Sequence, residues 1–254
     1  MNRKQLKRDA KSQLKGNWSW AICLYIISSL IISLINGINK EIIVPNKTLQ
    51  NLNLSEKTIY SITTFLITTF ITTIISWGVT YSILAFRDNT QDKPNVFKAS
   101  FAAFEHGRYL KTLKTSFLTG LFTGLWTILL IIPGIIKGYS YAMTPYIMKD
   151  MLTSKHDMKA TEAITQSRKL MLGHKWQLFW LDISFLGWAI INILLFVFGI
   201  IFCLVLNVAP ANLPIGIVLL ILAVMELFWL TPYYRQTKAN FYRQLAGNQF
   251  LEEK

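Results

Sequence analysis

The sequence predicts an all-α, polytopic membrane protein with six transmembrane helices. These helices form three hairpin units, each preceded by a cytoplasmic amphipathic interfacial helix. The composition is 52% hydrophobic and only 15% charged, whereas soluble domains carry about 25% charged residues. Several apolar segments also reach the roughly 20 residues that a membrane-spanning helix needs. We therefore expect a single integral membrane domain over residues 1–254, with units at about 1–90, 91–152 and 153–254.

The unit boundaries come from a pattern that occurs three times. A stretch rich in Lys or Arg ends at a glycine and runs directly into a long apolar segment. The copies are Arg3–Lys15 before Gly16, Val96–His106 before Gly107, and Asp157–Leu172 before Gly173. Because glycine commonly follows the last residue of a helix, each copy predicts a short helix and then a span.

Each of these short helices carries its apolar residues on one face. In the third copy they recur at helical spacing, at Ala160, Ala163, Ile164, Ser167, Leu170 and Met171. The corresponding stripes are Val96, Phe97, Ser100, Phe101 and Phe104 in the second copy, and Leu6, Ala10 and Leu14 in the first. Asp157 is available as the N-cap of the third helix. A basic amphipathic helix tethered to a span is expected in the interface plane; the alternative is a linker helix that packs on its neighbours.

Four apolar segments are long enough to span the membrane: Trp18–Ile35, Ile59–Phe86, Trp176–Leu206 and Ile215–Tyr234. A fifth region, Thr115–Met148, is too long for one helix at about 1.5 Å per residue across a core of about 30 Å. Proline and glycine interrupt helices, so Pro133-Gly134 predicts a break inside it. We expect helices at roughly 110–132 and 135–152, joined by a tight external turn.

The distribution of basic residues predicts the orientation. Residues 1–16, 87–114, 149–175 and the C-terminal end are rich in Lys and Arg, whereas the loops at 38–58 and 207–214 are not. The positive-inside rule places the basic regions in the cytoplasm. The chain must then return to the cytoplasm between Lys114 and Lys149, either by two full crossings or as a re-entrant pair. Both termini are predicted to be cytoplasmic.

Short sequences at the ends of the spans also recur. Two spans end at Phe86-Arg87-Asp88 and Met148-Lys149-Asp150, and Thr144-Pro145-Tyr146 is repeated as Thr231-Pro232-Tyr233. These recurrences support the division into three units.

The basic excess, 26 Lys and Arg against 13 Asp and Glu, indicates a preference for anionic lipid. In a soluble protein it would suggest nucleic acid, but here the charges lie beside spans, so we expect no nucleic-acid partner. The candidate residues for lipid headgroups are Arg168, Lys169, His174 and Lys175. The lipid bilayer of the plasma membrane, and a membrane protein, are the partners that the sequence favours.

Two acidic residues lie inside spans, where ionisable groups often have a function. Asp182 is about 9 Å into its span, and Glu226 is about 12 Å from the end of the last one. Antiparallel neighbours would bring them to similar depth, where they could share a proton or hold a cation. The alternative is structural, with Asp182 bonded to Arg168, His174 or Lys175 and Glu226 protonated.

The sequence offers no catalytic signature. It lacks a P-loop, a dinucleotide fingerprint and a nucleophile elbow. His106, His156 and His174 lack metal-ligand spacing. We therefore predict no catalytic residue, no metal site and no cofactor, and we do not expect an enzyme.

Several segments resemble a bacterial membrane-protein family called DUF975. They are Pro133–Tyr146, Glu162–Ile164, Ser167–Met171, Gly173–Trp176 and Leu181–Trp188. Similar proline, serine-arginine and glycine spacing occurs in the membrane domain of some glycerophosphodiester phosphodiesterases. The resemblance implies an integral membrane protein of Gram-positive type and brings no activity, since the phosphodiesterase catalytic domain is not in this chain.

Two functions fit these features. The first is a non-enzymatic envelope scaffold, accessory or protective factor, for example one that gives immunity to membrane-active peptides or assists an export system. The second is a small proton- or cation-coupled transporter or channel that uses Asp182 and Glu226. A continuous polar cavity that reaches both acids would favour transport, and a packed bundle would favour the first function.

Overall fold

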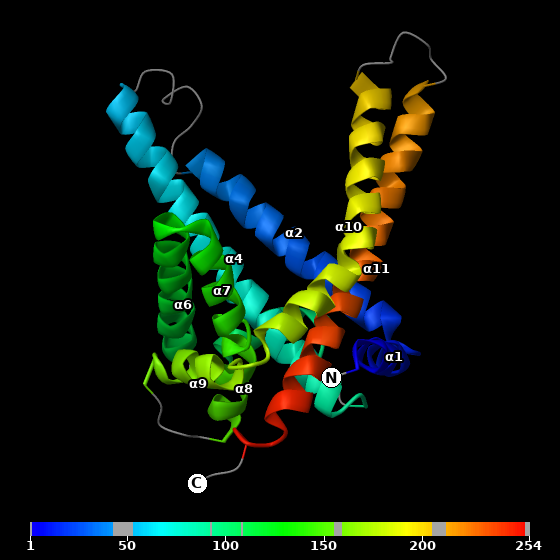
Figure 1. Cartoon of the computed structure of the whole chain (residues 1–254). Helices are drawn as coiled ribbons and strands as arrows, with labels where there is room; N and C mark the ends of the chain where they lie inside the picture. Colours follow the sequence, from blue (N-terminus) through cyan, green and yellow to red (C-terminus); the bar gives the residue numbers. More distant parts are fainter. Residues whose placement is uncertain are drawn as a thin grey trace.

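The computed structural model describes residues 2–42, 53–91, 93–107, 109–154, 159–204 and 212–251, and every regular element in these ranges is a helix (Figure 1). The helices are α1 Arg3–Leu14, α2 Trp18–Ile42, α4 Leu54–Asp88, α5 Val96–Ser100, η1 Ala102–Gly107, α6 Tyr109–Leu129, α7 Ile131–Tyr141, α8 Thr144–Thr153, α9 Glu162–Leu170, α10 Lys175–Leu204 and α11 Asn212–Ala246. The predicted all-α class is confirmed.

Within the described ranges, four helices are long and apolar enough to cross a membrane. They are α2 over Trp18–Gly37, α4, α10, and α11 from Leu213 onward. These are the four segments that the sequence marks most clearly, and they show a polytopic membrane protein. Their outer surfaces expose many large apolar side chains, such as Phe196 and Leu227, as expected for helices in contact with lipid.

The break in the Thr115–Met148 region lies earlier than predicted. The chain turns at Leu130, which is extended at φ −158° and ψ 129°, and not at Pro133-Gly134. Pro133 lies in the first turn of α7, where its missing N–H removes no helical hydrogen bond. Gly134 instead permits a close crossing, because an added Cβ would lie 2.6 Å from the Cα atom of Thr127 on α6.

The predicted helix over 135–152 is also divided in two. α7 ends at Tyr141, and α8 begins at Thr144 with Pro145 in its first turn. Proline is favoured at that position and cannot continue a preceding helix, which explains the second break. In Figure 1 the turn between α6 and α7 lies well below the far ends of the pair α10 and α11.

The glycine stops of the first and third short helices are confirmed. Gly16 and Gly173 have φ of 81° and 76°, a left-handed conformation that glycine adopts without steric cost. α1 has the predicted extent, whereas α9 is shorter than predicted. The proposed cap Asp157 lies outside the described residues.

The prediction of a single helix for the second copy is wrong, because this segment is divided into α5 and the 3-10 helix η1. α4 crosses directly over the end of α5, where an added Cβ on Gly78 would lie 2.6 Å from the carbonyl oxygen of Ser100. The Ser82 hydroxyl of α4 donates to the carbonyl of Ala99 at 2.7 Å. A side chain that hydrogen-bonds to a backbone carbonyl near the end of a helix competes for that carbonyl with the amide of the next helical turn.

The apolar faces of α1 and α9 pack against the protein. Leu6, Ala10 and Leu14 are buried beside α11, and the Ser167 hydroxyl of α9 donates to the Ser140 carbonyl of α7 at 2.8 Å. These two helices therefore use their apolar faces as linker helices do. The middle copy instead turns large apolar side chains of its stripe outward, with Phe97 59% and Phe104 43% exposed.

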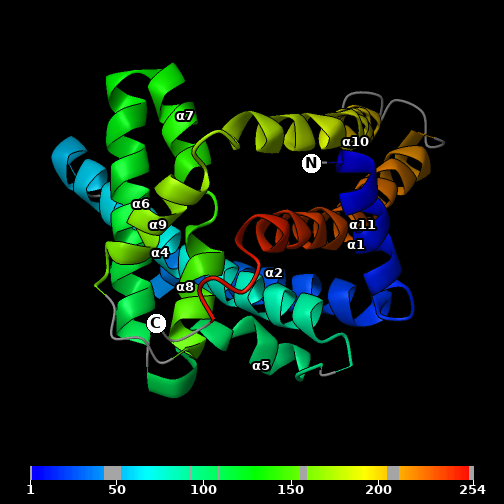
Figure 2. The ribbon, with the colours of Figure 1, turned by 60° about the horizontal axis from the view of Figure 1, so that its bottom comes forward.

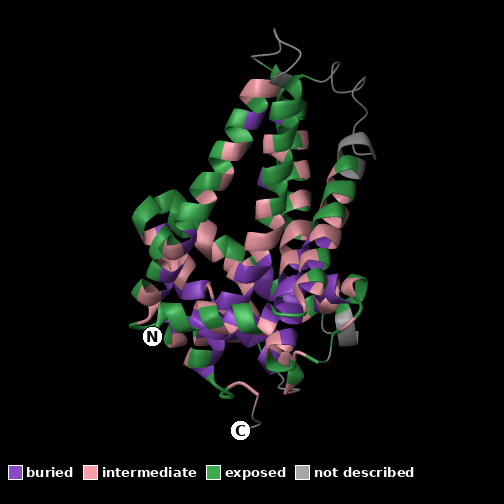
Figure 3. Ribbon diagram, turned by 90° about the vertical axis from the view of Figure 1, so that its right-hand side faces the viewer, coloured by how far each residue is buried: buried purple, intermediate pink, exposed green. Residues whose placement is uncertain are grey.

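The buried core lies at one end of the molecule. Figure 3 shows buried residues concentrated toward the end that holds α1 and the C-terminal part of α11, and exposed residues toward the opposite end. Seen from the core end, α11 lies centrally with α1, α2, α4 and α10 around it (Figure 2). The core centres on large buried side chains such as Leu24, Phe86, Ile147 and Tyr242.

Candidate functional site

Asp182 on α10 is held by α11. The Tyr234 hydroxyl donates a hydrogen bond to Asp182 Oδ1 at 3.0 Å, and the ring of Phe185 packs edge-on against Tyr234 at 5.3 Å. Tyr139 and Lys238 are close enough to interact electrostatically with the carboxylate. In the part of the chain that the structure describes, Asp182 makes no salt bridge, so its partner is Tyr234 and not the predicted basic residues Arg168, His174 or Lys175.

Glu226 lies apart from Asp182. It precedes Tyr234 by eight residues of α11, or about 12 Å along the helix axis. Both of its carboxylate oxygens are buried and have no hydrogen-bond partner among the described residues. A charged carboxylate is costly in apolar surroundings without a partner, so Glu226 stays a candidate for binding a proton or a cation. The structure does not bring the two acids together.

The predicted headgroup residues lie near one another where α9 meets α10. Arg168 and Lys169 are exposed on α9, and Lys175 begins α10. His174 Nδ1 lies 3.2 Å from Gln177 Oε1. Trp176 is 63% exposed and stacks on Phe179 at 4.8 Å, so basic and aromatic side chains adjoin at this end of α10, as is typical of a membrane interface.

The most strongly bonded polar group of the described core was not among the predicted site residues. Arg243 of α11 lies between Asp88 at the end of α4 and Asp150 of α8. Its Nε donates to Asp88 Oδ1 at 3.0 Å, and its terminal nitrogens donate to Asp150 at 2.7 and 3.1 Å, to Asp88 Oδ2, and to the Gly247 carbonyl at 2.9 Å. An arginine has five N–H donors, and all five are used.

Further contacts complete this network. The Tyr242 hydroxyl donates to Asp150 Oδ2 at 2.7 Å, and its ring stacks on Tyr146 at 5.2 Å. The side chains of Asp150 and Arg243 are 0% and 5% exposed. We call Arg243, Asp88, Asp150 and Tyr242 the Arg243 network. It joins one residue from each predicted unit, because Asp88, Asp150 and Arg243 belong to the first, second and third.

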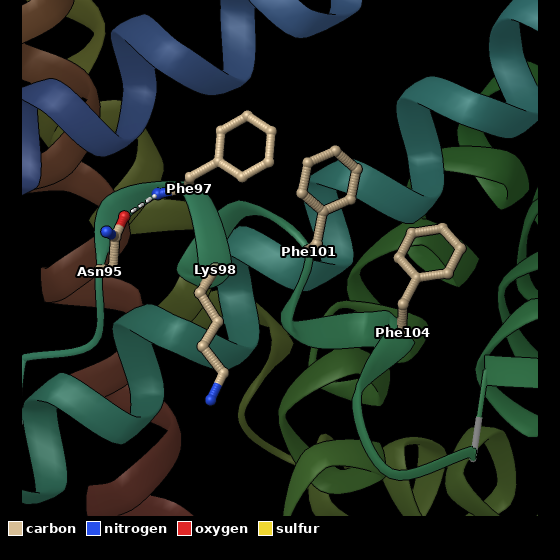
Figure 4. Close-up of a pocket in the computed structure, with 5 residues that line it drawn as sticks. All are labelled: Asn95, Phe97, Lys98, Phe101 and Phe104. Atoms are coloured by element: carbon tan, nitrogen blue, oxygen red, sulfur yellow. Dashed lines mark hydrogen bonds between the residues drawn. The ribbon is translucent and has the colours of Figure 1, made fainter.

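Two surface hollows lie away from the acids. One, of about 570 Å³, is lined by Asn95, Phe97, Lys98, Phe101 and Phe104 (Figure 4), and its three phenyl rings project to the same side of the loop. The other, of about 550 Å³, lies between α4 and α6 and includes Gly120 and Gly124. Neither hollow reaches Asp182 or Glu226. Within the described residues, no group of His, Cys, Asp or Glu is arranged to hold a metal ion.

Comparison with known proteins identifies the family. The model of a family described as a protein of unknown function (DUF975) matches residues 1–136 and again residues 127–249. The chain therefore belongs to the DUF975 family. No curated protein and no solved structure matches the chain. The further likeness to the membrane domain of glycerophosphodiester phosphodiesterases stays a prediction.

Proposed function

We propose that this protein is a non-enzymatic integral membrane protein that acts in the bacterial envelope as a scaffold, accessory or protective factor. The observation that carries the proposal is the Arg243 network. Its charged groups bond to one another across the junction of the three predicted units, and the two surface hollows lie elsewhere. A junction closed by internal bonds suits a protein that works through its surface better than one that conducts a solute.

The proposal includes contact with anionic lipid in the plasma membrane. Arg168, Lys169, His174 and Lys175 would meet the headgroups, supported by the exposure of the first two and by the neighbouring Trp176. Partner membrane proteins would then meet the apolar outer surfaces of the spans.

A deletion strain tests this function. We expect greater sensitivity to membrane-active peptides or other envelope stress, restored by the wild-type gene. Restoration by Asp182→Asn and Glu226→Gln variants, at normal protein levels, would separate the protective role from a transport role. A deletion strain that tolerates peptides, detergents and export-dependent stresses as well as the wild type does would contradict the proposal.

The second candidate function, a proton- or cation-coupled transporter or channel, is favoured by Glu226, whose buried carboxylate has no partner among the described residues. Proteoliposomes loaded with a pH-sensitive dye test it. Transport through this residue predicts a proton flux that Glu226→Gln abolishes, and Asp182→Asn should reduce it too. Equal fluxes in the wild type and both variants would remove this candidate.

We propose six crossings with both termini in the cytoplasm. α6 has 21 residues, or about 32 Å, whereas α7 has 11, or about 16 Å; the return crossing would therefore need α8 as well. α1 and the end of α11 pack together, which supports termini on one side. With Cys23 and Cys203 replaced by serine, Leu130→Cys should react with an impermeant thiol reagent from outside. A re-entrant pair would leave that cysteine unlabelled until the membrane is opened.

A further inference from the structure

Arg235 of α11 meets two hydroxyls of α4, and no carboxylate among the described residues. It is half-buried on α11, and in the described part of the chain no acidic side chain lies within salt-bridge distance of it. Among the residues that the structure describes, its terminal nitrogens donate to Thr80 Oγ1 and Ser76 Oγ alone, both at 3.4 Å. Such distances are long for charge-assisted bonds, which are usually 2.7–2.9 Å, so the donor capacity of this guanidinium is largely unused.

A second donor near Arg235, this one fully buried, also lacks a partner among the described residues. Tyr25 of α2 is 8% exposed, and its hydroxyl has no hydrogen-bond partner among the described residues. This hydroxyl and Arg235 are close enough to interact electrostatically. Buried polar groups normally find a partner, so an unbonded buried hydroxyl close to a guanidinium with two long hydrogen bonds indicates an acceptor that both groups could bind.

The local charge points to an anion. Lys238, one turn further along α11, also has no salt-bridge partner within the described ranges. Asp182 is the acid that interacts with it electrostatically, and Asp182 already accepts a hydrogen bond from Tyr234. Lys238 also interacts electrostatically with Arg235, so two cations gather near one carboxylate and the cluster carries an excess positive charge.

We propose that Arg235, Lys238 and the hydroxyls of Tyr25, Ser76 and Thr80 form a binding site for a phosphate group. A guanidinium presents a planar fork that suits two oxygens of one oxyanion, and the Tyr25 hydroxyl supplies a further donor. The phosphate could be free or the headgroup of an anionic phospholipid. This site is separate from Arg168, Lys169, His174 and Lys175, so the inference does not rest on the proposed function.

Thermal unfolding of the delipidated protein in detergent tests the site. Inorganic phosphate is titrated at constant ionic strength, with chloride as the comparison. In a second arm, soluble dihexanoyl phosphatidylglycerol is compared with dihexanoyl phosphatidylcholine. A higher Tm with phosphate alone identifies a free anion, one with phosphatidylglycerol alone identifies a lipid headgroup, and either supports the site. An equal response to chloride, or no response in either arm, overturns it.

Matched variants connect the response to these residues. Arg235→Gln should weaken phosphate binding roughly 10- to 100-fold, and Tyr25→Phe roughly 3- to 10-fold, as expected for a charged and a neutral hydrogen bond. Arg8→Gln and Tyr109→Phe, which change exposed residues in the same chemical way, should leave the affinity unchanged. If Arg235→Gln fails to fold, Arg235→Lys and Tyr25→Phe carry the test. Unchanged affinity in both site variants contradicts the proposal.

Discussion

Arg235 and Arg243 lie eight residues apart on α11 and have very different surroundings. Arg243 uses all five donors on Asp88, Asp150 and the Gly247 carbonyl. Arg235 has two long bonds to hydroxyls and no carboxylate partner in the described ranges. The same side chain on the same helix therefore serves two purposes. A fully paired arginine holds segments together, whereas an incompletely paired one is available to a ligand.

Among the variants that test this contrast, Arg243→Gln should lose the most stability. The substitution leaves Asp88 and the buried Asp150 with the weaker contacts that Lys149 makes to them at 3.9 and 4.0 Å, and removing one partner of a buried ion pair costs about 3–5 kcal/mol. Unfolding of the purified protein by denaturant in detergent micelles measures the loss. A loss below about 1 kcal/mol would mean that Arg243 contributes no more to stability than Arg235 does.

Asp150→Asn should have the second-largest effect. The amide keeps the shape of the side chain and can still accept from Tyr242, but Arg243 loses one of its two carboxylates. Because hydrogen bonds to charged groups contribute about 1.5–3 kcal/mol, we expect a loss in that range by the same unfolding measurement. Asp9→Asn, on the surface helix α1, serves as the matched control and should be nearly neutral. Equal losses in the two variants would argue against a special role for Asp150.

A pair of tyrosine substitutions should separate the two regions more finely. Tyr242→Phe removes a 2.7 Å hydrogen bond to Asp150 and should cost about 1 kcal/mol. Tyr25→Phe removes a hydroxyl that has no partner in the described part of the chain and should leave the ligand-free protein as stable or slightly more stable. The two variants are compared by thermal unfolding in phosphate-free buffer. A larger loss of stability in Tyr25→Phe than in Tyr242→Phe would contradict the roles assigned to both hydroxyls.

The smallest effect is expected from Arg235→Gln without ligand. Its two bonds are 3.4 Å long, so their loss should change the free energy of unfolding by less than about 1 kcal/mol. Unfolding in phosphate-free buffer measures this change. A loss as large as that of Arg243→Gln would show that Arg235 is a structural residue.

Local features of the fold were predictable because they depend on neighbouring residues. Gly16 and Gly173 end helices as expected, since a left-handed residue is needed there. Pro133-Gly134 correctly indicated an interruption but not its position, because proline is accepted in the first turn of a helix and the preceding residue Leu130 makes the turn.

The contacts between units were not predictable in the same way. Asp88 and Arg243 are separated by 155 residues, and Asp150 and Arg243 by 93. The recurring Arg87-Asp88 and Lys149-Asp150 sequences indicated that these acids occupy equivalent positions, but they did not indicate that Arg243 is the partner of both. Asp182 shows the same limit, since its depth was estimated from helix geometry while its bond to Tyr234 depends on the register between α10 and α11.

The register of α10 and α11 has a consequence for how the chain enters the bilayer. Near the far end, an added Cβ on Gly216 would lie 2.9 Å from the backbone nitrogen of Cys203. Midway, the amide of Asn192 donates to the Ala223 carbonyl at 2.7 Å. The two helices are thus in contact along their length, and each covers polar atoms of the other. During biosynthesis this favours insertion of the two helices as one preassembled hairpin, because α10 alone would carry the unpaired amide of Asn192 and the unpaired carboxyl of Asp182 into lipid.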